Sequence, residues 1–221
     1  MAISFAGGTD TIGYQSGWSY STGCFAFKMK TTQTTVNAVC ASIWSSASRT
    51  GFGFILNNTA NKLLVQGKDG TSTPRVSLLS TSNINDGNWH DVAFNWNVNN
   101  GGANALFIDG AQEASGNSSA AWSIVALNEP LTLGDNNDTF WPSYVGDLAE
   151  VAVWANRQLD GAEIAALAKG ASPSMIAPGA GSGLTFHAPL VRSPNNRLDT
   201  PITGPTGTTV SVHPRIIGGA V

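Results

Sequence analysis

Charged side chains are scarce in this chain of 221 residues, in which Asp, Glu, Lys and Arg together make up 11%. The 11 basic residues are scattered, whereas a nucleic-acid-binding protein needs a concentrated basic patch to displace counterions. No apolar stretch approaches the length of a membrane span. The sequence therefore predicts neither nucleic acid as a partner nor insertion into a membrane.

Cysteine is almost absent, since Cys24 and Cys40 are the only two, which excludes a disulfide framework. They lie symmetrically about Thr32, so a hairpin turn near Thr31–Gln33 would place them opposite each other and permit a disulfide. Two free, buried thiols are the favoured alternative. Residues Met1 to Gly8 carry no basic segment followed by an apolar one, so we expect no secretory signal and synthesis in a cytoplasm.

Acidic pairs suited to catalysis are also missing. A glycosidase needs two facing carboxylates, and a strand places them on one face at a spacing of two residues. None of the four glutamates has an acidic residue at that spacing, and Asp147 and Glu150, three apart, would face opposite ways on a regular strand. No Gly-x-Ser-x-Gly segment or zinc-type Cys/His spacing occurs, and His90 fits a structural role better than a catalytic one. We therefore expect a protein that is not an enzyme.

What the sequence does contain is segments that alternate with a period of two, separated at short intervals by Gly, Asn, Ser and Asp clusters, which predicts a β-sandwich or barrel and not βαβ units. In 91–98 the apolar residues Val92, Phe94, Trp96 and Val98 share one face, and the other face is polar. Asp109-Gly110 predicts a type I′ hairpin. The other expected strands are Ala2–Phe5, Gly23–Lys30, Ala38–Trp44, Gly51–Leu56, Lys62–Gln66, Ala105–Ile108, Leu131–Leu133 and Gly146–Trp154.

Two further segments carry specific expectations. In Leu148–Trp154 the apolar parity changes, so either both faces are covered or a bulge shifts the register. Asp160 and Glu163 form a capping-box pattern, with Leu159 and Ile164 at the staple positions and Gly170 after the helix. We expect this short helix to plug one end of the sandwich.

We expect one domain over residues 1–221. Residues 171–183 have the composition of a flexible connector. A linker to a second domain is one interpretation, but the 184–221 segment is too short for its own core. We therefore expect strands near Leu184–Leu190 and Thr208–Ile217 to return to the same sandwich.

Four motifs in sequence order resemble a laminin-G-like domain. They are Asp86–Ala93 (DGNWHDVA), Leu106–Gly110 (LFIDG), Gly146–Trp154 (GDLAEVAVW) and Arg157–Leu159 (RQL). The resemblance spans roughly Ile3 to Lys169 and implies membership of the concanavalin A-like lectin/glucanase superfamily. It implies an all-β fold, an antiparallel two-sheet jelly-roll sandwich with one short helix.

The end of the chain departs from that layout. Gly183–Leu190 looks like the strand that often opens such domains, which suggests a circular rotation of the fold. Ser211–Ile216 looks like the close of phage members of the family, which are often virion proteins.

The segment Gly134–Tyr144 combines oxygen-bearing side chains with aromatic ones, and the resemblance implies that such an edge loop can hold calcium or a sugar. Carboxylate and amide oxygens suit calcium, and aromatic rings can stack on a sugar. The alternative is a solvated turn with Trp141 packed on the protein or on a neighbouring subunit. The calcium candidates are Asp135, Asn136 and Asp138, and the glycan candidates are Asn136, Asn137, Phe140, Trp141 and Tyr144.

Taken with the absence of a signal, the resemblance favours an accessory virion protein that is not an enzyme. Its expected role is capsid decoration on a phage, with viral capsid or other virion proteins as partners, weak adhesion to surface glycans and a homo-oligomeric state. The alternative is a stand-alone carbohydrate-binding lectin module, calcium-dependent if the Asp135 loop holds the ion, and extracellular in location.

Overall fold

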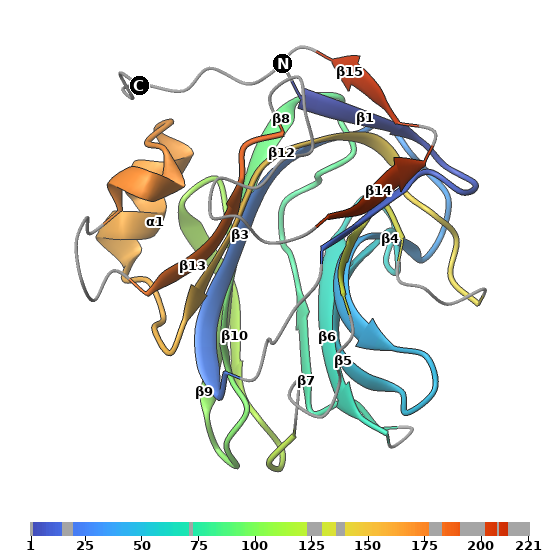
Figure 1. Cartoon of the computed structure of the whole chain (residues 1–221). Helices are drawn as coiled ribbons and strands as arrows, with labels where there is room; N and C mark the ends of the chain where they lie inside the picture. The colour runs from blue at the N-terminus through green and yellow to red at the C-terminus, as the bar shows by residue number, and fades with distance from the viewer. Residues whose placement is uncertain are drawn as a thin grey trace.

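Two antiparallel β-sheets pack face to face in the computed structural model of this chain, as Figure 1 shows. The structure describes residues 2–14, 20–70, 73–122, 130–135, 140–176, 183–190, 202–206 and 208–211. The all-β, two-sheet sandwich with one short helix that the sequence predicts is confirmed. In the described part of the chain, no helix is long and apolar enough to cross a membrane.

One sheet has eight strands. In spatial order they are β10 (Ala111–Asn117), β9 (Ala103–Ile108), β8 (Trp89–Asn97), β3 (Thr22–Lys30), β12 (Val145–Ala155), β1 (Ala2–Ala6) and β15 (Thr209–Ser211), with β13 (Leu184–Ala188) also paired to β12. The other sheet has seven. They are β14 (Ile202–Thr206), β2 (Thr11–Tyr14), β11 (Leu131–Leu133), β4 (Ala38–Ser45), β5 (Thr50–Leu56), β6 (Leu63–Asp69) and β7 (Val76–Leu79).

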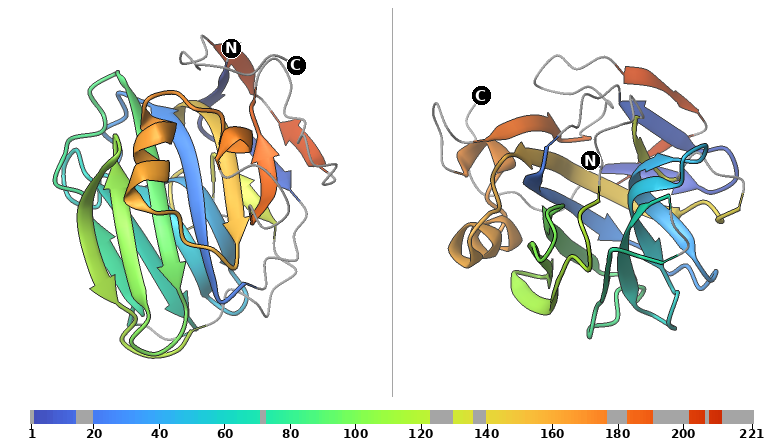
Figure 2. Two further views of the ribbon diagram at one scale, coloured as in Figure 1. Left: turned by 90° about the vertical axis from the view of Figure 1, so that its left-hand side faces the viewer. Right: turned by 90° about the horizontal axis from the view of Figure 1, so that it is seen from below.

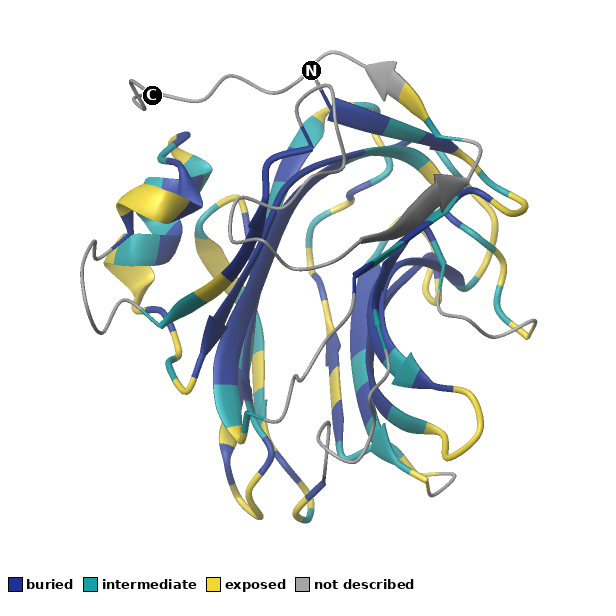
Figure 3. Ribbon diagram, in the orientation of Figure 1, coloured by how far each residue is buried: buried dark blue, intermediate teal, exposed yellow. Residues whose placement is uncertain are grey.

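The core lies between the sheets and is rich in aromatic rings. Alternation directs Phe25 of β3 and Phe94 of β8 inward from one sheet, and Phe52 and Phe54 of β5 inward from the other. Their ring centroids are 5.1–6.1 Å apart, mostly in edge-to-face geometry. The buried residues on the facing surfaces are dark blue in Figure 3. The inward face predicted for 92–98 is confirmed.

Strand β12 shows both features that could explain its change of apolar parity, a bulge and coverage of both faces. A bulge between Ala149 and Ala152 places Glu150 at φ 50°, and Leu148, Val151 and Val153 then all face the core. Trp154 faces outward, yet it is fully buried in a second apolar cluster beneath a helix. This sheet is therefore covered on both faces at that point.

The helix α1 (Gly161–Ala168) begins as predicted. Asp160 accepts a hydrogen bond from the Glu163 backbone nitrogen, and the Glu163 side chain accepts one from the Asp160 nitrogen. Its predicted place is wrong. The helix lies on the outer face of the eight-stranded sheet, as the left view of Figure 2 shows, and Ile164 and Leu167 pack there against Trp154. A 3₁₀ helix, η1 (Pro173–Met175), follows it.

Two other expectations need correction. The hairpin through Thr31–Gln33 is wrong, because β3 and β4 belong to different sheets, and Cys24 and Cys40 are free and buried in different clusters. The polar face predicted for 91–97 is not solvated throughout. Asn95 is buried and exchanges hydrogen bonds with the Leu159 backbone, because the segment leading into α1 covers it.

The predicted hairpin turn and the strands at the end of the chain are both present in the structure. Asp109 and Gly110 both have positive φ, 52° and 84°, as the predicted type I′ hairpin between β9 and β10 requires. Strands β13, β14 and β15 pair with β12, β2 and β1 respectively, so segments after residue 183 add to both sheets. The division of the chain into one domain stays a prediction. Residues 177–182 of the expected connector lie outside the described residues.

Candidate functional site: a hollow on the outer face of the seven-stranded sheet

The outer face of the seven-stranded sheet carries a regular arrangement of side chains. The register of β4, β5 and β6 aligns their outward residues in three rows across the strands. The central position is glycine in two of the rows, so little side-chain volume stands above β5. The rows are Trp44, Gly51 and Lys68; Ser42, Gly53 and Gln66; and Val39, Ile55 and Leu64.

All of these residues except Gly51 and Leu64, together with Trp141, line a hollow of about 40 Å³, which we call the outer hollow. Gly53 lies at its centre, Trp44 and Lys68 lie on either side of one end, and Trp141 lines it as well. A glycine within a strand often marks a place where a ligand approaches the backbone closely. The outer hollow thus combines two indole rings with the polar groups of Gln66 and Lys68.

Trp141 reaches the outer hollow from the segment after β11. The backbone of Val39 donates a hydrogen bond to the Pro142 carbonyl at 3.0 Å, which fixes this segment beside β4. The Trp141 ring packs against the row of Val39, Ile55 and Leu64. Phe140 meets Trp141 edge to face, with ring centroids 5.2 Å apart, and is 76% exposed. Two of the predicted glycan residues therefore lie at the surface.

Tyr144 does not belong to that surface, so its predicted contact with a sugar needs correction. Its side chain is fully buried in the main core, edge-on to Phe5. Its hydroxyl donates to the carbonyl of Lys30 at 2.9 Å and also lies 3.2 Å from that of Asp147. Burial raises the pKa of this hydroxyl well above its ordinary value. Tyr144 anchors the end of the loop instead of presenting a ring.

The predicted calcium and amide ligands are mostly outside the described residues, because Asn136, Asn137 and Asp138 all are. Asp135 is described: its carbonyl accepts a hydrogen bond from Ser42, and its carboxylate lies 3.4 Å from the Ser143 hydroxyl. Among the described residues, no group of three His, Cys, Asp or Glu side chains converges as a metal site. Calcium binding stays a prediction.

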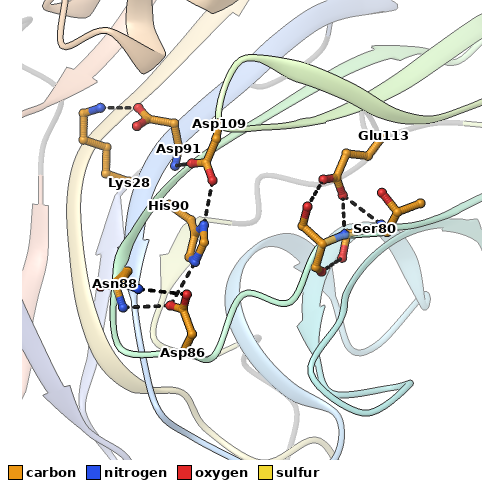
Figure 4. A network of polar contacts seen from close by, with 10 residues as sticks. Lys28, Ser80, Asp86, Asn88, His90, Asp91, Asp109 and Glu113 are labelled. Atoms are coloured by element: carbon orange, nitrogen blue, oxygen red, sulfur yellow. Dashed lines mark hydrogen bonds and ion pairs between the residues drawn. The ribbon is translucent and has the colours of Figure 1, made fainter.

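The histidine of the sequence motif lies in a network at the rim of the eight-stranded sheet, shown in Figure 4. His90 Nδ1 is 2.8 Å from Asp109 and Nε2 is 3.1 Å from Asp86. The hydrogen bond to Asp109 raises the pKa of His90, although burial opposes the shift. Hydrogen bonds from Asn88 lower the pKa of Asp86 to about 2. Because both ring nitrogens are engaged, the predicted structural role of His90 is confirmed.

Each described glutamate also has a structural partner. Glu113 accepts hydrogen bonds from the backbone of residues 81 and 82 and so ties the two sheets together at one rim, as Figure 4 shows. Glu150 lies 2.8 Å from His187, and both are buried. Glu163 completes the helix cap. Glu129 and His213 lie outside the described residues. The three described glutamates thus all have partners within the fold.

The sequence prediction found Trp141 and missed Trp44, Gln66 and Lys68. A signal for them exists in Gly51-Phe52-Gly53-Phe54, where glycine alternates with phenylalanine. Such a strand buries its aromatic face and leaves its other face without side chains. Its partners are not evident without the register, since β4 contains a bulge between Val39 and Ala41 that shifts the parity of Ser42 and Trp44.

Known proteins similar to this chain agree on the fold. The chain is 30% identical over 107 residues to the neuronal pentraxin receptor of Mus musculus, an alignment that covers 46% of this chain and 21% of the receptor. The chain therefore spans about a fifth of the length of that curated relative.

Two solved structures extend the comparison. The native heptameric SAP-like pentraxin of Limulus polyphemus has a TM-score of 0.68 at 15% identity, with 96% of this chain and 94% of that one covered. The CBM40 of the Ruminococcus gnavus IT-sialidase, bound to α2,3 sialyllactose, has a TM-score of 0.57 at 16% identity, with 76% and 96% covered.

The family assignment rests on a longer match. Residues 4–165, well over half of the chain, match the model of the family described as the concanavalin A-like lectin/glucanases superfamily. This range contains the four sequence motifs, the outer hollow and most of helix α1. The chain belongs to the concanavalin A-like lectin/glucanases superfamily.

Proposed function

We propose that this protein is a carbohydrate-binding domain of the lectin type, without enzymatic activity, and that it binds a sugar in the outer hollow. The observation that carries the proposal is the position of Trp141, whose ring flanks a glycine-floored depression on an exposed sheet face. The Ruminococcus gnavus module, of the same fold, is a sialyllactose complex. Of the two functions predicted from the sequence, we thus favour the alternative, a carbohydrate-binding lectin module, over capsid decoration.

The chemistry of the outer hollow suits a sugar ring. An indole ring offers a flat apolar surface to the C–H face of a pyranose, while its N–H remains a donor. The Gln66 amide can both donate to and accept from sugar hydroxyls. Because the hollow is shallow, it fits one sugar residue lying on the surface, and affinity should then depend strongly on Trp141.

Two variants test the proposal from opposite directions. Trp141→Ala removes the ring, and we expect at least an about tenfold loss of affinity on a glycan array followed by calorimetry. Gly53→Val fills the hollow and leaves both tryptophans in place. A Cβ at Gly53 would meet Ser42, Ala41 and Val39 atoms at 3.7–3.9 Å, which is ordinary contact, so the strand can accept it.

The matched control is Met175→Ala, which removes an apolar side chain 49% exposed in η1, outside the outer hollow. It should leave binding unchanged. Sugar binding that survives both Trp141→Ala and Gly53→Val would contradict this site. Repeating the array with a chelator tests the calcium prediction for the Asp135 loop, since calcium-dependent binding is lost when the ion is removed.

The capsid-decorating function stays a prediction, with a virion location, virion partners and a homo-oligomer. The proteins named above are an animal receptor, an animal pentraxin and a bacterial sialidase module, none of which carries a virion name. The pentraxin is heptameric, which supports the predicted homo-oligomer but neither the virion location nor the virion partners. Co-purification with phage particles would favour a virion role, and free lectin activity would favour an extracellular one.

A further inference from the structure

Lys68 stands out among the residues of the outer hollow because it is the one charged side chain that lines it. The six ion-pair contacts between described residues involve other cations, so Lys68 has no ionic partner in the described part of the chain. The neighbouring carboxylate, Asp69, should face the other side of β6 by alternation, and it pairs with Arg75 at 2.7 Å. The ammonium group of Lys68 is therefore available to pair with an anionic ligand.

The position of Lys68 defines where an anionic group would lie. It shares a row with Trp44, and Gly51 lies between them, so the two side chains start about 10 Å apart with no side chain in between. Gly53 extends this gap between side chains into the next row, beside Gln66. A sugar ring resting over the two glycines would have the ammonium group on one side and an indole on the other.

A second polar group also lacks a partner. Trp44 Nε1 is buried and makes no hydrogen bond within the described residues. An indole N–H is a donor only, and leaving it unpaired costs free energy, but this nitrogen is covered by the protein and is not open to a ligand in the outer hollow. The Ser42 hydroxyl, in contrast, already donates to the Asp135 carbonyl. The Lys68 ammonium and the Gln66 amide are therefore the donors with which the outer hollow can meet the acceptors of a ligand.

We propose that the outer hollow binds an acidic sugar residue, whose ring packs against the tryptophans and whose carboxylate pairs with Lys68. The inference rests on the proposed function and narrows it to one class of saccharide. Lysine suits this task as a compact charge with three donors. Lys68 is half-buried at the edge of the outer hollow, so the attraction is less screened than between two fully exposed charges.

Calorimetry with four probes tests this proposal: 3′-sialyllactose and trigalacturonic acid, which carry carboxylates from two different sources, and the neutral sugars lactose and galactotriose. We expect at least one acidic probe to bind about tenfold more tightly than its neutral counterpart. The acidic probe that binds identifies the source of the carboxylate. Its affinity should fall as salt rises, because the ion pair is partly exposed.

Lys68→Met keeps the side-chain stem and removes the charge, so it should abolish the preference for the acidic probe and leave neutral binding intact. Lys169→Met is the matched control, since it makes the same change in net charge at an exposed residue that ends helix α1. Equal affinity for acidic and neutral probes, or an equal effect of the two variants, would overturn the inference but not the proposed function. Binding of none of the probes would overturn both.

Discussion

The two outer faces of this sandwich differ, because helix α1 covers one of them and an open hollow lies on the other. On the eight-stranded sheet, the outward residues Ala26, Ala93 and Ala152 are small, and helix α1 covers them, leaving a hollow of only about 20 Å³ between helix and sheet. On the seven-stranded sheet, Gly53 has no side chain either, and the outer hollow remains open above it. Small residues create space on both faces, and helix α1 covers most of that space on one face alone.

The distribution of charge reinforces the contrast. Most ion pairs of the described residues lie on elements of the covered side, including Lys28 with Asp91 beneath the helix and the buried Glu150–His187 pair. Burial raises the pKa of Asp91, and Lys28 opposes that rise. The open face has Lys68 without such a partner. We infer that the covered face serves stability and the open face serves recognition.

The most severe test of this contrast compares two tryptophans. Trp154 is fully buried under α1, and Trp154→Ala should lower the free energy of unfolding by about 3–5 kcal/mol, as expected for a large side chain lost from a core. Trp141→Ala on the open face should cost far less stability and lose sugar binding instead. Urea denaturation followed by circular dichroism measures the difference.

The reverse ranking of the two variants would break the comparison, because it would mean that Trp141 supports the fold and not a ligand. Loss of sugar binding by Trp154→Ala under conditions in which that variant is still folded would also contradict the comparison.

A smaller effect is expected at the start of the covering helix. Asp160→Ala removes the acceptor of the Glu163 backbone N–H and should cost about 1 kcal/mol. Asp160→Asn is the matched control, because asparagine caps helices about as well, and it should stay close to the parent protein. Sugar affinity should be unchanged in both. Equal losses for the two variants would show that charge, and not the cap, holds the helix.

Prediction from sequence succeeded where the signal is local. The capping box, the Asp109-Gly110 turn and the inward face of β8 each depend on residues close together in sequence, and all three are confirmed. The site was predictable only in part. Trp141 lies in a conspicuous loop, but Lys68 becomes relevant through its register with Gly51 and Trp44 across three strands. Tyr144 was misjudged because composition does not show which way an aromatic ring points.

The smallest expected effect concerns pH and the rim of the covered sheet. The pKa of His90 is raised in the folded protein, chiefly by the hydrogen bond to Asp109, and Asp86 adds to it. The protonated histidine therefore stabilises the fold fully below the unfolded value of about 6.5, and this contribution is lost as pH rises through the folded pKa. We expect the urea midpoint to fall between pH 6.5 and the folded pKa.

His90→Gln should reduce that slope, since glutamine can hydrogen-bond to the same carboxylates without titrating. Titration of the His90 ring protons by NMR, assigned by comparison with this variant, gives the folded pKa directly. An unchanged slope in His90→Gln would show that another group causes the pH dependence. Sugar binding at the outer hollow should stay insensitive to the variant, because the His90 network and the outer hollow lie on different sheets.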